Sequence, residues 1–596
     1  MVKHTVREHQ EINDIYRKSA LVAGRTDKMA LPYIGSMLCA AVVTAVDSVV
    51  AGINIGKDGL AAIAASGPLL AVTLILHCML GYGIDKLMIR AIGKGNRKEA
   101  DRIFGAIIIA VFVVYLAVLL PMLLFERKLL ELFIKDPILA DMVIRYSRPI
   151  LAAQPVLEVF LCIERAFHID GRAKLLAMSS INTSVGNILF DFLLAGVFKL
   201  GVSGLAWASV ISALLGYSTS LSHFFSKKRT VTPDFSVLFS CREMLSYIRD
   251  DIRLGSSATL DELMEGVVLT VQTGAISAAA GTDGLAIWAI YKTLRGIVLA
   301  LSNGVSTSVC VHAGLLYGQK DYDGVRFSAK AGMKQALGIC LIAVAVILSF
   351  ALPIAGVFHI SPGLRLLCAR CLRIGCIAFP AIVFTTIISY YLPAVNRVGL
   401  TNLLVTIQKI LPIIAGIIGY RMGMCGIFTG YVIACAAAAL ILLVFLKRDG
   451  FWFVPKRDPG MIFDYSIRLT PDQISAMKAD VEEKLLAGSY SADFCSKASL
   501  VTEDGMNSIS RQNTDTVVRA DIRMKRFEDG VQITIIDDGV AYSPLSDLAE
   551  SDPDRPGALE AMIVLGLTAD VNYDRVLDLN HLSLYLNLPA DTGPDA

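Results

Sequence analysis

The sequence predicts an all-α polytopic membrane protein with twelve transmembrane helices in two six-helix repeats, followed by a C-terminal cytoplasmic α+β domain. Of its 596 residues, 55% are hydrophobic and only 18% are charged, and the mean hydropathy is +0.59. Such a composition is far from that of a soluble protein. Residues 460–596 instead hold 24 acidic and 11 basic side chains. The formal charge of +2 therefore combines about +15 in the apolar part with −13 in this tail.

An internal repeat predicts the two halves of the apolar part. The sequence Gly59-Leu-Ala-Ala-Ile returns as Gly284-Leu-Ala-Ile, and Gly93-Lys-Gly-Asn-Arg returns as Gly318-Gln-Lys-Asp-Tyr. Both pairs are displaced by 225 positions, so two separate anchors agree on one offset. Duplicated halves in transporters place a substrate site at their interface and rock against each other.

The predicted spans follow in order from apolar runs close to the ~20 residues that cross a bilayer. Residues 1–28 are polar and lack a cleavable signal pattern, so we expect the first span to direct insertion. The spans are expected at 29–54, 60–84, 103–125, 138–164, 174–197, 203–225, 255–281, 285–316, 331–357, 363–393, 399–420 and 424–446.

The same runs predict the domain organisation. It comprises an N-terminal cytoplasmic tail (1–28), an N-lobe of six spans (29–225), an inter-lobe cytoplasmic loop (226–254), a C-lobe of six spans (255–447), a linker (448–469) and a soluble domain (470–590). Lys and Arg concentrate in alternate connections, for example Lys94, Arg97 and Lys98, which the positive-inside rule assigns to the cytoplasm. We therefore expect a multi-pass protein of the cytoplasmic membrane with both termini inside and its basic part against anionic lipid headgroups.

Ionisable residues inside predicted spans are costly in hydrocarbon and indicate function. Asp47 lies well inside the first span, Asn187 and Asp191 lie one helical turn apart in the fifth, and Glu265 lies in the seventh. A buried carboxylate can take up a proton or offer oxygen ligands to Na⁺, and either event couples an ion gradient to conformation. The alternative is that these groups face a water-filled cleft or cap a helix and carry no ion.

These residues carry a resemblance to a known family. The phrase Val46-Asp-Ser-Val-Val-Ala-Gly, the loop that starts at Gly93 and the 225-residue repeat resemble the multidrug and toxic compound extrusion (MATE) transporters of the multidrug/oligosaccharidyl-lipid/polysaccharide (MOP) flippase superfamily. The resemblance covers roughly residues 20–450. It implies two six-helix bundles around a V-shaped cavity and export of an organic, often cationic, compound against inward flow of H⁺ or Na⁺.

The resemblance also implies site residues. Asp47 matches the family's acidic residue on the first helix, Asn187 and Asp191 match its Asn-x-x-x-Asp pair on the fifth, and Ser209 falls where a Thr commonly completes that cluster. Glu265 resembles the acidic position on the seventh helix of one subgroup.

Two departures make the N-lobe the better candidate for ion coupling. The acidic partner expected on the tenth helix is absent, because the stretch Phe384-Thr-Thr-Ile-Ile-Ser-Tyr-Tyr offers only hydroxyls. At the 225 offset, Gln272 stands where the first half has Asp47. The ion chemistry of the two halves is therefore predicted to be asymmetric.

The acidic tail shows alternating helices and strands. Helices are predicted over 474–487, 499–510 and 558–567, and strands over 517–527, 530–537, 570–576 and 582–588. The Asp-Gly pair at 529–530 supplies a hairpin turn between the first two of these strands. This layout predicts helices on one face of a mostly antiparallel sheet.

The tail resembles the GHKL (histidine-kinase-like) ATPase fold, in particular the anti-sigma-factor serine kinases. Glu503-x-x-x-Asn507 resembles that family's N-box, in which Asn holds Mg²⁺, and Asp537-x-Gly539 resembles its adenine-reading box. The resemblance implies ATP and Mg²⁺ as ligands, with Gly557 in the phosphate lid.

That lid departs from the family's pattern. It reads Gly557-Ala-Leu-Glu560, and a glutamate beside phosphates repels them. The alternative is a fold retained without nucleotide binding, in which the domain regulates transport or docks a cytoplasmic regulatory protein.

Three functions remain, of which an ion-coupled exporter with a regulatory tail is preferred. The second is a lipid-linked oligosaccharide flippase of the same superfamily, and the third is a membrane sensor with an anti-sigma-type kinase or partner-switching domain. Enzyme activity is not expected of the membrane part, no cofactor is required for transport, and an acidic soluble domain argues against nucleic acid as a partner.

Overall fold

The computed structural model divides the chain into two compact units. The membrane unit is Thr26–Pro455, and the C-terminal unit combines Met1–Arg25 with Lys456–Ala596. The structure describes residues 20–54, 59, 62–63, 65–131, 134, 136–170, 172–224, 231–358, 362–448, 451–455, 458, 460–514, 516–527, 529–541 and 558–588.

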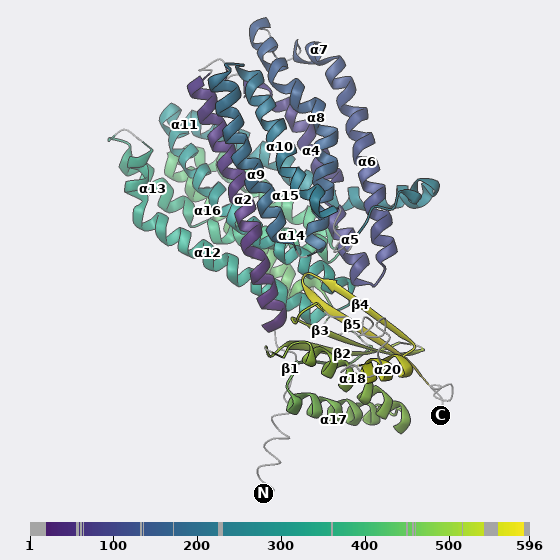
Figure 1. The fold of residues 1–596 in the computed structure, drawn as a ribbon. Helices are drawn as coiled ribbons and strands as arrows, with labels where there is room; N and C mark the ends of the chain where they lie inside the picture. Colours follow the sequence, from purple (N-terminus) through teal and green to yellow (C-terminus); the bar gives the residue numbers. More distant parts are fainter. Residues whose placement is uncertain are drawn as a thin grey trace. The chain divides into compact units, whose positions relative to one another are not determined.

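The membrane unit consists of helices that run side by side (Figure 1). In chain order they are α2 (Ala20–Asn54), α4 (Gly67–Leu80), α5 (Ile84–Gly93), α6 (Arg97–Leu124), α7 (Glu126–Glu131), α8 (Pro137–Ile169), α9 (Ala173–Asp191), η1 (Phe192–Val197), α10 (Val202–Phe224), η2 (Phe235–Phe239), α11 (Cys241–Gly318), α12 (Tyr322–Val357), α13 (Arg365–Cys376), α14 (Phe379–Ala394), α15 (Val398–Gly419), η3 (Tyr420–Met422), α16 (Gly423–Arg448) and η4 (Phe451–Phe453).

Within the described residues, eight helical segments are long and apolar enough to cross a membrane, among them Arg97–Leu124 and Tyr322–Val357. Val202–Ser218 is a shorter apolar helix. The protein is therefore a helical membrane protein, and the count of twelve spans stays a prediction.

The repeated sequence phrase forms the same structure in each half. Asn96 caps α6 by accepting a hydrogen bond from the Glu99 amide at 3.1 Å, and Asp321 caps α12 by accepting one from the Gly324 amide at 2.8 Å. The two caps are 225 positions apart. A side-chain acceptor at this position satisfies an amide that the helix leaves without a partner. The repeat therefore preserves the start of a long membrane helix in both halves.

The two halves also meet through equivalent positions. A Cβ atom on Gly93 would overlap the Leu315 carbonyl oxygen and would lie 2.9 Å from the Gly318 Cα. A Cβ atom on Gly318 would lie 2.6 Å from the Arg90 carbonyl oxygen. Gly93 with Gly318, and Arg90 with Leu315, are again 225 positions apart. The contact is thus nearly symmetric between the halves, and it requires glycine on both sides.

Several helices are interrupted. The chain turns between α4 and α5 at Gly81–Gly83, and α11 bends at Gly281, whose φ is 58°. The segment η1 is a π-helix that follows α9 without a break. Such interruptions in membrane helices are tolerated where the freed backbone groups are buried in protein or line a cavity, and they concentrate at functional sites.

The C-terminal unit contains a five-stranded antiparallel sheet in the order β1-β2-β3-β5-β4. Its elements are β1 (Met461–Arg468), α17 (Pro471–Ala487), α18 (Ala492–Arg511), β2 (Arg519–Arg526), β3 (Gly530–Asp537), α20 (Ala558–Leu567), β4 (Asp570–Val576) and β5 (Leu579–Asn587). In Figure 1 the three helices lie on one face of this sheet. The predicted hairpin between β2 and β3 is present, with Ile522 opposite Ile535.

Alternating residues of the strands build the core of this unit. Ile522, Ile533 and Leu584 of the sheet belong to one apolar cluster with Val481 of α17 and Val501 of α18. All five residues are fully buried. Period-two alternation is typical of a sheet with one face against helices. Strand β1 was not predicted, since its residues fall in the expected linker.

Residues at the start of α2 belong to the C-terminal unit. Leu21 is buried with Ile536 and Leu579 in a small apolar cluster, and Arg25 forms an ion pair with Asp578 at 3.3 Å. The first turn of α2 and the β4–β5 turn, which lie at opposite ends of the sequence, are therefore packed together.

Candidate functional site

The predicted N-lobe site lies between α9 and α10. Asn187 and Asp191 of α9 are 2% and 1% exposed, and the Asn187 side-chain amide lies 3.5 Å from the Ser209 hydroxyl of α10. The helices approach closely here, because a Cβ on Gly186 would lie 3.3 Å from the Ser212 Cβ. The structure thus brings Asn187 and the half-buried Ser209 together, with the buried Asp191 one helical turn along α9 from Asn187.

The π-helix η1 begins directly after Asp191. A π-turn widens the helix and shifts its hydrogen bonds, which makes backbone carbonyls available near the inserted residue. Together with the carboxylate and the Asn187 amide, this provides hard oxygen ligands of the kind that Na⁺ prefers, or a carboxylate that can take a proton. The predicted partner Asp47 lies on α2, and its side chain is outside the described residues.

The predicted C-lobe residue Glu265 is paired with two cations. Its carboxylate accepts hydrogen bonds from Arg295 at 2.7 Å and from Lys409 at 2.7 Å. Lys409 also contacts Asp261 at 2.9 Å. Two permanent charges on one carboxylate hold it in its ionised form, so Glu265 acts here as the centre of an ion cluster.

The Glu265 cluster lines a cavity of about 250 Å³. The hydroxyl groups that the sequence places on the tenth helix face the same space: the lining includes Thr385, Thr386, Ser389 and Tyr390 of α14. Arg295 and Lys409 were not predicted as site residues, although both lie in predicted spans. Intramembrane cations are as informative as intramembrane carboxylates.

A second cavity of about 360 Å³ lies in the first half and is mostly apolar. Tyr33 and Met37 of α2, Arg165 of α8 and Tyr217 of α10 contribute to its lining. Among the described residues, a polar cavity thus lies in the second half of the membrane unit and a largely apolar cavity in the first.

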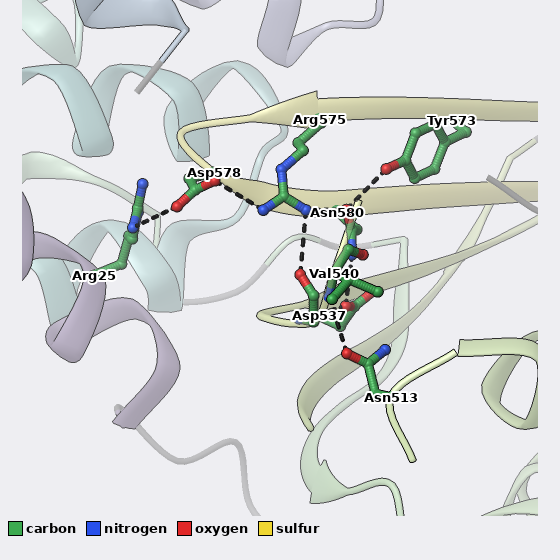
Figure 2. Close-up of polar contacts among 9 residues, drawn as sticks. Arg25, Asn513, Asp537, Val540, Tyr573, Arg575, Asp578 and Asn580 are labelled. Carbon is green, nitrogen blue, oxygen red and sulfur yellow. Dashed lines mark hydrogen bonds and ion pairs between the residues drawn. The ribbon is translucent and has the colours of Figure 1, made fainter. Parts of the chain in front are cut away.

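The predicted adenine-reading carboxylate of the C-terminal unit is the centre of a polar network (Figure 2). Asp537 is fully buried at the end of β3, and its Oδ1 accepts hydrogen bonds from the Asn580 side-chain amide at 2.8 Å and from the Gly539 amide at 2.8 Å. Asn580 in turn accepts from Tyr573 at 2.8 Å and from Arg575 at 2.7 Å. This network orients the carboxyl rigidly.

Among the described residues, the second oxygen of Asp537, Oδ2, is buried without a hydrogen-bond partner. Burial raises the pKa of this carboxyl to about 6, although hydrogen bonds from Asn580 and Gly539 lower it. An unpaired buried acceptor is energetically unfavourable, and a ligand that donates a hydrogen bond relieves it. The exocyclic amine of adenine is such a donor, so this site fits the base that the resemblance implies.

The remaining predicted nucleotide residues give a weaker fit. Glu503 of α18 forms an ion pair with Lys478 of α17 at 2.6 Å, and Asn507 is half-buried one turn further along α18. Gly557 lies outside the described residues. Within the described part of the chain, no group of three or more His, Cys, Asp or Glu side chains could hold a metal ion.

Relatives and solved structures of membrane transporters are similar to the membrane part of this chain. A probable multidrug resistance protein NorM from Chromobacterium violaceum is 22% identical over 475 residues, which cover 74% of this chain and 96% of that protein. A probable NorM from Agrobacterium fabrum is 23% identical over 460 residues, which cover 72% of this chain and 92% of that protein.

The fold agrees with that of solved transporters. An outward-facing multidrug resistance MATE transporter of the MOP superfamily matches 72% of this chain and 98% of its own length, with a TM-score of 0.67 and 20% identity. A MOP superfamily transporter from Pyrococcus furiosus, described as having a binding pocket of reversed polarity, matches with a TM-score of 0.66 and 19% identity over 73% and 98% of the two chains.

The family model described as MatE matches residues 32–193 and 260–418, one segment in each half of the repeat. These segments contain Asn187, Asp191 and the Glu265 ion cluster, and together they make up more than half of the chain. The protein therefore belongs to the MATE family of membrane transporters.

Proposed function

We propose that this protein is an ion-gradient-coupled antiporter that exports organic, cationic compounds across the cytoplasmic membrane by alternating access, with H⁺ or Na⁺ as the coupling ion. Both termini are then cytoplasmic. The observation that carries the proposal is the pair of buried polar side chains Asn187 and Asp191, beside the π-helix and next to the Ser209 hydroxyl. A carboxylate kept in a membrane interior is retained for ion or substrate binding, because it is otherwise costly.

The polar cavity of the second half supports a cationic substrate. Three carboxylates line it, from Asp261, Glu262 and Glu265, against the two cations Arg295 and Lys409. One negative charge remains in excess. Tyr390 and Tyr431 also line the cavity, and the charge of an organic cation interacts favourably with the face of an aromatic ring.

Dye efflux from proteoliposomes tests the antiporter. A proton gradient and then a sodium gradient are imposed on liposomes that carry the wild type, Asp47→Asn or Asp191→Asn, and efflux of a fluorescent organic cation is recorded. We expect efflux to follow one gradient and to disappear in both variants. The matched control is Asp141→Asn, an exposed carboxylate of α8 paired with Arg127 at 3.8 Å, which should leave efflux intact.

Flux that is independent of any gradient, or that survives both Asp47→Asn and Asp191→Asn, would overturn coupling through the N-lobe. No flux with any organic cation would favour the flippase alternative of the same superfamily.

We further propose that the C-terminal unit is a regulatory domain of the histidine-kinase-like ATPase type that binds an adenine nucleotide without being required for export. The support is the Asp537 network, whose free carboxyl oxygen suits the amine of adenine. Binding of ATP, with and without Mg²⁺, is measured by calorimetry on the full-length protein. Asp537→Ala should weaken binding at least tenfold while efflux is only modulated.

The matched control for this site is the neighbouring Asp538, which is exposed and accepts a hydrogen bond from the Arg519 amide at 2.9 Å. Asp538→Asn should leave ATP affinity unchanged. Absence of any heat of binding to the wild type would leave a domain that docks a cytoplasmic protein instead.

A further inference from the structure

A cavity of about 440 Å³ lies beside the contact between the two halves of the membrane unit. Its lining comes from α5 and α6 of the first half, from both ends of α11, and from the start of α12. Gly318 is part of the lining, and an added Cβ on this residue would lie 2.6 Å from the Arg90 carbonyl oxygen. Sites for small molecules have volumes of ~300–1,000 Å³. The cavity can therefore hold a small molecule that contacts both halves.

The lining of this cavity has more positive than negative side chains. The four cations are Arg90, Lys94, Arg253 and Lys320, and the two carboxylates are Glu99 and Asp250. These groups are ionised at neutral pH in their ordinary states, which leaves an excess of two positive charges. Within the described part of the chain, Lys94, Arg253 and Lys320 form no ion pair. The cavity therefore attracts an anion.

Both carboxylates of the lining have other partners. Glu99 Oε2 accepts a hydrogen bond from the Asn96 side-chain amide at 2.9 Å, in the cap of α6. A carboxylate in the first turn of a helix is also stabilised by the helix dipole. Asp250 lies 3.5 Å from Arg249, which is outside the lining. Neither carboxylate is therefore fully available to neutralise the cations of the cavity.

Arg90 is held at one nitrogen and unsatisfied at another. Its Nε donates to the Lys86 carbonyl oxygen at 3.0 Å, which fixes the guanidinium on α5. Among the described residues, its Nη2 is buried without a hydrogen-bond partner. Asp250 attracts this charge and Arg253 repels it. A buried donor is costly to leave unpaired, so an anion that accepts from the guanidinium relieves this cost.

Lys320 has a backbone conformation that glycine provides in the other half. Its φ is 56°, and Gly95, which stands 225 positions earlier, has a φ of 77°. Glycine adopts this left-handed conformation freely, whereas a residue with a Cβ atom is strained by it. A lysine therefore stands where the repeat has a less strained solution. Its position in the lining indicates that the charge, rather than the turn, is what this residue contributes.

The donors of the cavity suit a phosphate group. Guanidinium and ammonium groups form short, charge-assisted hydrogen bonds with phosphate oxygens. The hydroxyl groups of Tyr247 and Tyr317 and the amide of Asn396 add neutral donors to the lining. A phosphate monoester carries about −1.5 to −2 charges at pH 7, which matches the excess positive charge. Leu87 and Ile103 provide apolar surface for the organic part of the same molecule.

We propose that this cavity binds a phosphate monoester that bridges Arg90 and Lys94 of the first half to Lys320 of the second, and so stabilises their closed contact. The phosphate belongs either to a lipid headgroup or to a soluble ester. A lipid can reach the site from the cytoplasmic leaflet, the side to which the sequence assigns Lys94. The site is distinct from the Asn187–Asp191 pair and from the Glu265 cluster. Only its effect on closure rests on the proposed function, which requires that the halves separate.

Native mass spectrometry of the full-length protein in detergent measures binding. One arm contains phosphatidic acid, whose headgroup is a phosphate monoester, and the other contains glycerol 3-phosphate. Phosphatidylcholine, which lacks a monoester, is the reference lipid. We expect a saturable adduct in at least one arm and a much weaker one with phosphatidylcholine. An adduct with phosphatidic acid alone identifies a lipid headgroup, and an adduct with glycerol 3-phosphate identifies a soluble ester.

Two variants remove cations from the lining. Arg90→Gln should weaken the adduct at least tenfold, because it removes the buried charged donor. Lys320→Gly removes an exposed cation and relieves its backbone, so binding should weaken about two- to fivefold while the melting temperature does not fall. The matched control is Lys447→Gln, an exposed cation near the end of α16 that is not part of the lining, which should keep the wild-type affinity.

Pulsed electron paramagnetic resonance in phosphatidylcholine liposomes measures the distance between the two halves. Genetically encoded labels are placed at the exposed positions Lys98 of α6 and Lys330 of α12. Addition of the phosphate monoester that binds should raise the closed fraction of wild type and leave that of Arg90→Gln unchanged. Because coupling is reciprocal, Gly318→Ala, which obstructs the closed contact, should weaken binding by the factor by which the ligand favours closure.

The proposed site is wrong if neither arm gives an adduct, or if Arg90→Gln and Lys320→Gly bind as tightly as wild type. It is also wrong if Lys447→Gln weakens binding as much as they do, since the attraction is then a general effect of charge. Binding that leaves the distance between the halves unchanged would overturn the bridging role. Neither measurement needs transport, so a failure of ion-driven efflux leaves both results interpretable.

Discussion

Replacing Gly93 or Gly318 by alanine should disfavour closure of the two halves where α5 meets α11. A Cβ on Gly318 would lie 2.6 Å from the Arg90 carbonyl oxygen, whereas an ordinary contact is at least 3.4 Å. The obstacle is backbone rather than a flexible side chain, so the helices must separate by about 0.8 Å. Overpacking of this kind costs about 1–3 kcal/mol.

That free energy is expected to act on closure rather than on folding. It corresponds to about a 5- to 150-fold shift toward the open arrangement. Alanine is a better helix former than glycine by about 0.5–1 kcal/mol, so thermal stability should be nearly unchanged. The assay combines the efflux rate with the distance between the halves, and Gly338→Ala is the control because nothing lies within 4 Å of its added Cβ.

The symmetry of the contact adds a second requirement. Since Gly93 and Gly318 obstruct the same approach, the double variant should shift closure by less than the sum of the two single shifts. If either single variant kept the wild-type efflux rate and the wild-type distance between the two halves, the close contact of Gly93 with Gly318 would not control closure. Full additivity would show that the two substitutions act at separate places.

Three further changes test the ion cluster and the C-terminal unit. Asp537→Asn should stabilise that unit at pH 7. The folded carboxyl binds its proton more tightly than the unfolded one, so stability falls as pH rises from 3.8 to about 6, by at most ~3 kcal/mol; chemical unfolding at pH 4 and pH 7 measures this. Glu265→Gln leaves Arg295 and Lys409 without their shared carboxylate and should lower membrane-unit stability by about 3 kcal/mol in a thermal unfolding scan. Leu21→Ala should destabilise the C-terminal unit by about 2 kcal/mol, because it removes buried methyl groups.

Each of these three predictions has an outcome that would contradict it. A pH dependence of stability that is the same in Asp537→Asn and wild type would place the titrating group elsewhere. An unchanged melting temperature in Glu265→Gln would mean that water already solvates the cluster. Leu21→Ala without effect on the C-terminal unit would show that the start of α2 contributes no net stability to it.

The sequence predicted the elements whose patterns are local. The repeat at Gly93 and Gly318 led to two equivalent halves, and the structure shows why it persists: its polar residues cap α6 and α12, and its glycines meet each other. The Asp-Gly hairpin and the strands on either side of it were also correct, since alternation and turn chemistry act over a few residues.

What the sequence did not predict depends on distant pairings. Nothing near His77 in the chain indicates that Glu158 lies against it, and nothing near Lys409 indicates that it neutralises Glu265. Strand β1 was missed because its pairing with β2 connects residues about sixty positions apart. The π-helix after Asp191 was missed because its sequence, Phe-Leu-Leu-Ala-Gly-Val, suits an ordinary helix equally well.

The packing of Leu21 against Ile536 and Leu579 has a consequence for synthesis of the protein. The ribosome makes the start of α2 first and its partners last, roughly 560 residues later. At about 5–20 residues per second, half a minute to two minutes pass between them. During that interval every downstream membrane helix can insert into the bilayer. The apolar side chain of Leu21 has no partner to pack against in the meantime. The turn can be buried only after translation has nearly finished, so a chain cut short before β5 leaves it exposed.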